Sequence, residues 1–106
     1  MIVKKTIYLG LNDKDTKTQL ISTLEAYKVV NNLLVDSFSG GTIFEAQGIY
    51  KHEDNTIVIE RTLRIELLLF GADDSIKVDS LIKTLKQVFN QESVAVQTEH
   101  VDSELV

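Results

Sequence analysis

The chain contains no cysteine and no proline, and only five of its 106 residues are glycine. The absence of cysteine excludes a disulfide framework, a thiolate metal site and a cysteine nucleophile. With no proline and few glycines, no stretch is typical of a long or low-complexity linker. The length fits one domain, which we place over residues 1–106 with a flexible acidic tail at 102–106.

Basic surfaces and long apolar runs are also missing. The net charge of −5 at pH 7 disfavours binding to nucleic acid or to an anionic membrane. No segment stays apolar for the ~20 residues that a membrane-spanning helix needs. The first residues, MIVKKTIYLGL, lack the apolar length and the cleavage site of a signal peptide. We therefore expect a cytoplasmic protein that binds neither nucleic acid nor membranes.

Alternating side chains predict a β-hairpin in the middle of the chain. In residues 56–70, TIVIERTLRIELLLF, isoleucine and leucine fill the odd positions except Arg61, and mostly polar residues fill the even ones. This period of two is typical of a strand with one buried face. Residues 42–50 alternate in the same way, and the residues between the two strands tolerate turns.

The turn also predicts how the two strands pair. A turn centred on residues 54 and 55 places Phe44 opposite Ile65 on the buried face and Glu45 opposite Arg64 on the polar face. A slip by one residue would place Phe44 against Arg64, which we expect to be disfavoured. Arg61 either lies at the rim of the sheet with its guanidinium in water, or is a buried cation that holds a carboxylate or a ligand anion.

The remaining elements follow from their own patterns. We expect a strand over residues 2–11, a helix from a capping box at 16–19 to about residue 32, a helix that starts at Asp74 or Ser75 and stops at Asn90, and a strand over 93–101. The order β-α-β-β-α-β predicts a ferredoxin-like α+β sandwich. In this fold a four-stranded antiparallel sheet, with the first and third strands central, carries both helices on one face.

Several spaced residues add a resemblance to a family. They are Gly48 and Tyr50, then Glu60, then the run FNQESV at residues 89–94, with YLGL at 8–11 in the first strand. With these residues the chain resembles an uncharacterised bacterial family of small ferredoxin-like proteins. The resemblance implies the fold and no activity. The missing leader segment argues against a role outside the cytoplasm.

The sheet face that the helices leave uncovered is the predicted functional surface. Its simplest interpretation is a solvated face with cross-strand ion pairs. The leading functional interpretation is a non-enzymatic interaction or regulatory module that acts through this face or the strand edges, as a homo-oligomer or with a protein partner. The candidate binding residues are Tyr8, Glu45, Gln47, Glu60, Thr62, Arg64, Glu66 and Gln97.

Two alternatives remain open. One is a small-molecule-binding protein or enzyme on the same face, in which Glu60 or Glu66 acts as a base and Arg64 holds an anion. The polar character of the face argues against catalysis, because a shifted pKa needs an apolar pocket. The other is an acidic inhibitor that mimics nucleic acid, which the intermixed Lys4 and Arg64 disfavour.

Neither histidine adds a catalytic or metal-binding hypothesis. His52 and His100 do not have the spacing of metal ligands. We expect His52 in the hairpin turn and His100 at the rim of the sheet, packed against a helix. We assign no catalytic residue, metal or cofactor.

Overall fold

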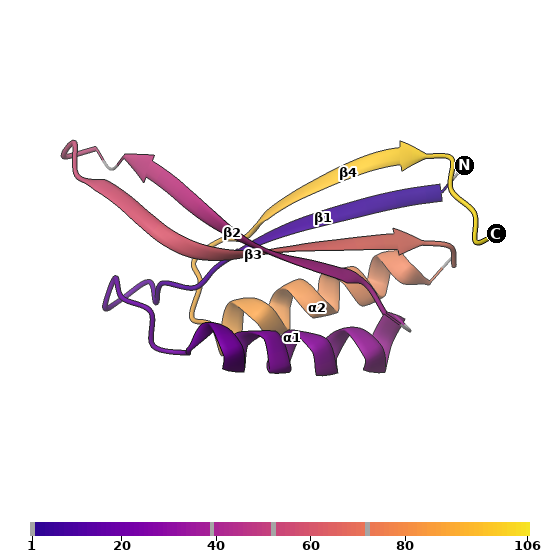
Figure 1. Ribbon diagram of the computed structural model, residues 1–106, viewed down its shortest axis with the longest axis horizontal. Coiled ribbons are helices and arrows are strands. Elements are labelled where there is room, and N and C mark those ends of the chain that lie inside the picture. The colour runs from indigo at the N-terminus through magenta and orange to yellow at the C-terminus, as the bar shows by residue number, and fades with distance from the viewer. Residues whose placement is uncertain (1, 39, 52, 72) are drawn as a thin grey trace.

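The computed structural model describes residues 2–38, 40–51, 53–71 and 73–106. Its elements are, in order, β1 (Ile2–Gly10), α1 (Thr23–Phe38), β2 (Thr42–Lys51), β3 (Ile57–Leu69), α2 (Asp74–Val88) and β4 (Ala95–Val101). The strands form one antiparallel sheet in the order β2-β3-β1-β4, and both helices cover the same face of it (Figure 1). The predicted ferredoxin-like α+β sandwich is confirmed, with β1 and β3 in the centre.

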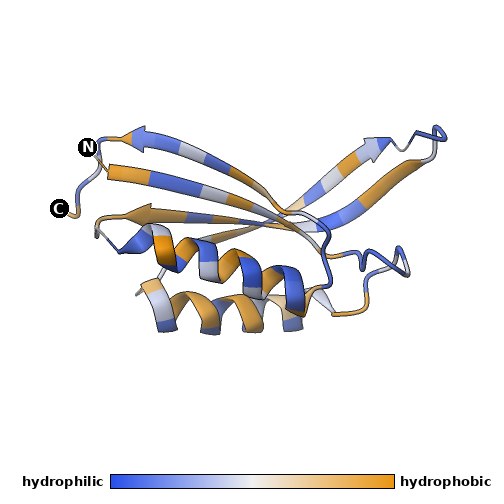
Figure 2. Ribbon diagram, turned by 180° about the vertical axis from the view of Figure 1, so that it is seen from behind, coloured by the Kyte–Doolittle hydropathy of each residue, from blue (hydrophilic) through white to orange (hydrophobic). Residues whose placement is uncertain are grey.

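The core lies between the two helices and the odd-numbered side chains of the central strands. Figure 2 shows the apolar segments along both helices and along β3. Burying large aliphatic side chains stabilises the fold by roughly 1.5–3 kcal/mol each. This burial fixes which face of β1 and β3 meets the helices, and it leaves the even-numbered side chains on the open face. The fully buried strand and helix residues include Ile7, Leu9, Leu63, Ile65, Val30 and Leu85.

The pairing of β2 with β3 differs by one residue from the predicted register. Phe44 lies opposite Arg64, and Ile43 lies opposite Ile65. The prediction was wrong because the last pair, Lys51 and Ile57, leaves five residues between the strands instead of the assumed two-residue turn, and an odd number shifts the register by one. The Arg64 side chain stays partly exposed on the open face, where its guanidinium stacks on the Phe44 ring, 4.2 Å from the ring centroid, although its Nε atom is buried.

The far ends of β2 and β3 extend beyond the rest of the sheet. The pairing of β1 with β3 ends at Gly10 and Thr62, whereas residues 47–51 and 57–61 continue to pair with each other. We call this part of the hairpin the arm, and Figure 1 shows it projecting away from the body of the protein. The arm is the wall of the candidate site described below.

Strand β4 pairs with β1 of its own chain. His100 lies opposite Val3, on the face of the strand that points toward the helices. It is exposed, so the expected packing against a helix is wrong. The helices cover the central strands and leave β4 open along its length. His52 lies outside the described residues.

The start of α1 also differs from the prediction. Residues 16–19 do not begin a helix, because the side chain of Asp13 accepts the backbone N–H groups of Asp15 and Thr16 and closes a tight loop there. The helix begins at Thr23, and the hydroxyl of Ser22 accepts the N–H of Glu25 at 3.2 Å as its N-cap. It then continues to Phe38, beyond the predicted end.

Helix α2 follows its prediction closely. It begins at Asp74 and ends at Val88, and Asn90 takes a left-handed backbone conformation with φ of 48°. Asparagine tolerates this conformation better than most residues, and it is a common way to end a helix. Among the helices of the described residues, none is long and apolar enough to cross a membrane.

The observed register predicts a coupling between Phe44 and Arg64. We expect a double-mutant cycle of Phe44→Ala and Arg64→Ala, followed by urea unfolding, to give a coupling free energy of about 0.5–1 kcal/mol. The same cycle between Phe44 and Arg61, which lie on opposite faces, should give a coupling near zero. Equal couplings in the two cycles would contradict the register.

Candidate pocket at the base of the hairpin arm

A pocket of about 360 Å³ opens where the arm meets two loops. One loop follows β1 and the other precedes β4. The volume lies within the range of roughly 300–1,000 Å³ that is usual for small-molecule sites. Its lining residues are Asn12, Asp13, Lys14, Lys17, Tyr50, Val58, Glu60, Gln91, Glu92 and Ser93.

Glu60 projects from the arm into this pocket, and a glycine on β1 makes room for it. Gly48 is its direct neighbour on β2, and the Glu60 carboxylate lies against Gly10 of β1. A Cβ atom on Gly10 would lie 2.5 Å from Glu60 Oε1, so any other residue there would displace the carboxylate. The backbone N–H of Asn12 donates to Glu60 Oε2 at 3.0 Å. The sequence therefore places and holds one carboxylate at the pocket wall.

Tyr50 and Val58 form the less polar side of the pocket. They lie opposite each other on the arm and share the parity of Glu60. Partial burial raises the pKa of the Tyr50 phenol above its ordinary 10.0, and the negative charge of Glu60 raises it further. Tyr50 is therefore protonated at neutral pH and can donate a hydrogen bond to a ligand.

Asp13 organises the loop that forms the opposite wall. Its Oδ2 atom accepts the N–H groups of Asp15 and Thr16 at 2.9 and 3.0 Å, and its Oδ1 atom accepts from the Asn90 amide at 2.8 Å. The Thr16 N–H, followed by the Asn90 amide, holds the pKa of Asp13 below its ordinary 3.8, although partial burial acts in the opposite direction. Asp13 is thus an ionised structural residue, and its oxygens are already used within the protein.

The pocket contains charges of both signs. Lys14 and Lys17 lie on the loop, and Glu92 lies on the segment before β4. Lys17 has a left-handed φ of 62°, and its ammonium donates to the carbonyl of Lys14 at 2.5 Å. Within the part of the chain that the structure describes, no group of three His, Asp or Glu side chains is arranged to hold a metal ion. The arrangement is suited to a polar organic molecule.

Most of the residues predicted on the open face lie there, but outside this pocket. The Tyr8 hydroxyl donates to Gln97 at 2.9 Å. The Nε atom of Arg64 lies 3.5 Å from a carboxylate oxygen of Glu66. Thr62 is buried between its neighbours. Of the predicted site residues, only Glu60 lines the pocket.

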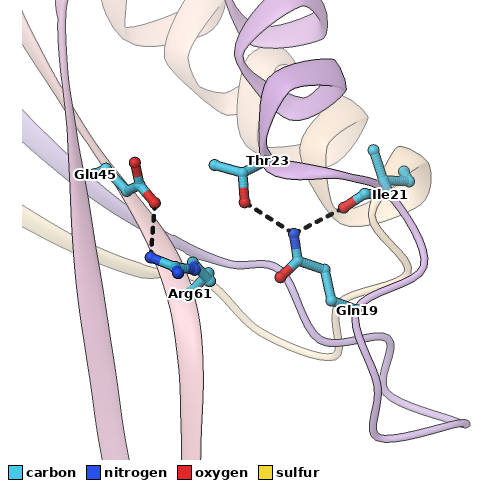
Figure 3. Close-up of polar contacts among 5 residues, drawn as sticks. All are labelled: Gln19, Ile21, Thr23, Glu45 and Arg61. Atoms are coloured by element: carbon cyan, nitrogen blue, oxygen red, sulfur yellow. Dashed lines mark hydrogen bonds and ion pairs between the residues drawn. The ribbon is translucent and has the colours of Figure 1, made fainter.

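Glu45 and Gln47 lie on the other side of the sheet, so their prediction as open-face residues is wrong. The one-residue shift of β2 turns both side chains to the parity of Arg61. Glu45 forms an ion pair with Arg61 at 2.9 Å, which Figure 3 shows. Arg61 is exposed, as expected for a rim arginine with its charge in water. Figure 3 also shows how Gln19 donates to Ile21 and Thr23 and so fixes the approach to α1.

The sequence analysis missed the other residues of the pocket. Tyr50 lies on the strand whose register was wrong, and residues 16–19 were expected to begin a helix. A signal was nevertheless present, because Tyr50, Glu60 and residues 91–93 are among the positions that carry the family resemblance. These positions are far apart in the sequence, and the fold brings them together at one pocket.

Comparison with known proteins identifies the family. Residues 4–104 match the model of the family "Protein of unknown function (DUF3574)", and the chain belongs to this family. The expected resemblance to an uncharacterised family is confirmed. A comparison with curated proteins finds no match.

Two solved structures have a similar fold. Both are of a phage SAM lyase, one in complex with S-methyl-5'-thioadenosine and one in the apo state. Each is 24% identical to this chain with a TM-score of 0.71, and each alignment covers 92% of this chain. It covers 80% of the lyase chain in the complex and 78% in the apo structure. At this identity the likeness establishes the shared fold.

These structures change the order of the functional interpretations. The leading expectation, a non-enzymatic interaction or regulatory module, is wrong as the first choice, because the matching structures of this fold are those of an enzyme. The alternative of a small-molecule-binding protein or enzyme is supported better. The pocket at the base of the arm does not answer the objection that a shifted pKa needs an apolar pocket, because most of its lining residues are polar or charged.

The lowered pKa of Asp13 predicts a loss of stability in acid. A carboxyl whose pKa is lower in the folded state stabilises the protein above its ordinary pKa, and this contribution disappears as the pH falls through the folded-state value. We expect Asp13→Asn to flatten the dependence of the urea midpoint on pH between about pH 5 and about pH 2. Parallel pH profiles for the wild type and the variant would contradict this role.

Proposed function

We propose that this protein binds a small organic molecule in the pocket at the base of the arm and acts on it as an enzyme. The observation that carries the proposal is the placement of Glu60. Its carboxylate is held at the pocket wall by the Asn12 N–H at 3.0 Å, over a glycine that leaves it room. Such a held carboxylate is suited to binding a positively charged or hydrogen-bond-donating group and to accepting a proton.

The other pocket residues suggest a division of roles. Tyr50 stays protonated, so it supplies a hydrogen bond and an aromatic face for a ring to stack on. Lys14 and Lys17 supply positive charge on the opposite wall. Of the pocket carboxylates, Asp13 is occupied by hydrogen bonds from Asp15, Thr16 and Asn90. We assign the proton-accepting role to Glu60 rather than to Glu92, because the Asn12 N–H holds the Glu60 carboxylate at the pocket wall.

The class of ligand that we propose is an adenosine thioether or sulfonium compound. The support is the fold shared with a phage SAM lyase that was solved with S-methyl-5'-thioadenosine. A molecule of this class has a flat ring for Tyr50 and hydroxyl groups that can donate to Glu60. In the sulfonium form it also carries a positive charge, which a carboxylate would attract.

Ligand titration tests this proposal directly. We expect S-methyl-5'-thioadenosine or SAM to shift the backbone amide NMR signals of Asn12, Tyr50, Glu60 and Glu92. By calorimetry, Glu60→Gln should weaken the binding of that ligand about tenfold or more, because a hydrogen bond to a charged group is lost. Gly10→Ala should weaken binding in the same direction, since the added methyl group displaces the Glu60 carboxylate.

Glu45→Gln is the matched control for these variants. It removes a carboxylate from the same hairpin, but this carboxylate lies on the other face of the sheet and outside the pocket. The affinity should stay at the wild-type value. If neither compound moves the amide signals of the pocket, the proposed ligand class is wrong. If Glu60→Gln binds the ligand as tightly as Glu45→Gln does, the role of Glu60 is wrong.

Self-association also stays a prediction, as does a cytoplasmic location. Support for self-association comes from the arm, where Ile49, Ile57 and Ile59 share one parity and are 66%, 62% and 57% exposed. Covering this surface with a second copy would remove apolar area from water. We expect light scattering after size exclusion to give a mass above that of the 11.9 kDa chain, and Ile59→Lys to shift the mass toward the monomer. A monomeric wild type would contradict this.

A further inference from the structure

We propose that Asn90, which does not line the pocket, is a positioning residue that places the Glu60 carboxylate through the loop at residues 12–18. This inference rests on the proposed function, since the pocket is the site whose affinity Asn90 would control. It extends that function from the residues of the pocket to the end of α2.

The backbone conformation and the side chain of Asn90 both allow it to hold this loop. Its left-handed backbone, with φ of 48°, turns the chain away from α2 and brings its side chain to the loop. The side-chain amide has two N–H groups, and both are used. One donates to Asp13 Oδ1 at 2.8 Å and the other to Asp15 Oδ2 at 2.9 Å. Hydrogen bonds of this kind, with a charged acceptor, are stronger than those between neutral groups.

The main chain of Asn90 adds a third contact. Its carbonyl accepts the N–H of Lys14 at 3.0 Å. The neighbouring side chain of Gln91 donates to the carbonyl of Asn12 at 2.6 Å. The end of α2 therefore contacts the loop at four consecutive residues, 12–15, that are about 75 positions away along the chain.

The loop in turn holds Glu60. Asp13, fixed by Asn90, closes the turn by accepting the N–H groups of Asp15 and Thr16. The residue immediately before it, Asn12, donates its N–H to Glu60 Oε2. A change at Asn90 should therefore move the Asn12 N–H and release the carboxylate, although Asn90 lies outside the pocket lining.

The ordinary structural role of Asn90 is to end a helix, and two variants separate this role from positioning. Asn90→Gly keeps a residue that adopts the left-handed conformation easily and removes only the amide. Asn90→Asp keeps the size of the side chain but replaces the donor with a carboxylate that faces Asp13 and Asp15. In both variants we expect the amide of Asn12 to exchange with solvent on the order of tenfold faster by NMR.

A swap of donor and acceptor tests the hydrogen bond itself. In Asp13→Asn combined with Asn90→Asp, the new amide at position 13 can donate to the new carboxylate at position 90, while its oxygen still accepts the backbone N–H groups. We expect this double variant to recover part of the protection of the Asn12 amide. The recovery is partial because Asp15 would still face a carboxylate.

The binding measurement uses S-methyl-5'-thioadenosine as the probe. We expect Asn90→Gly to weaken its binding about tenfold. Val78→Ala, a buried change in α2 far along the helix from the pocket, should lower the free energy of unfolding without changing the affinity or the exchange of Asn12. This control separates positioning from a general loss of stability.

The outcomes decide between the two proposals. Unchanged exchange of Asn12 in Asn90→Gly, or a swap variant no better than Asn90→Asp alone, would overturn the positioning role. An affinity loss in Val78→Ala equal to that in Asn90→Gly would also overturn it. If the probe does not bind the wild type, the proposed ligand class fails, and the exchange of Asn12 still decides the role of Asn90 by itself.

Discussion

The burial of one face of the two central strands is the constraint from which the rest of the structure follows. Ile7, Leu9, Leu63 and Ile65 are fully covered by the helices, and each of them fixes the direction of its neighbours because side chains alternate along a strand. The even-numbered residues of β3 are therefore turned away from the core. Glu60 belongs to that set, and its position in the pocket is a consequence of how the core is packed.

The pocket depends on the parts of the hairpin that the core does not reach. Beyond Gly10 and Thr62, β3 pairs with β2, and the loop after β1 contacts it through the N–H groups of Leu11 and Asn12, which donate to the Arg61 carbonyl and the Glu60 carboxylate. The arm can therefore leave the plane of the sheet and form a wall opposite the loop after β1. A polar, mixed-charge cavity at this junction needs no apolar core of its own, since Asp13, Asn90 and Gln91 order the loop with hydrogen bonds.

The site thus combines two kinds of support. The glycine at position 10 gives the Glu60 side chain space, and the backbone of Asn12 gives it a fixed hydrogen-bond donor. Without the Asn12 N–H, the Glu60 carboxylate would have space but would be mobile. Without the glycine, a Cβ atom would keep the carboxylate from reaching that N–H.

The sequence by itself determined the elements, the topology and the buried face, because the periods of 2 and 3.6 residues record which side chains meet the core. The tertiary structure decided the strand register, the conformation of the loop after β1 and the composition of the pocket, which the period of the sequence does not indicate. The register of β2 depended on the odd number of residues, 52–56, between the last paired residues of the hairpin, which moved Glu45 and Gln47 to the other face. Local capping rules predicted a helix start at residues 16–19, but Asp13 closes a loop there, and its carboxylate also accepts the amide of Asn90, 77 positions away. The pocket joins three such distant segments, and only their packing shows that Tyr50, Glu60 and Glu92 line one cavity.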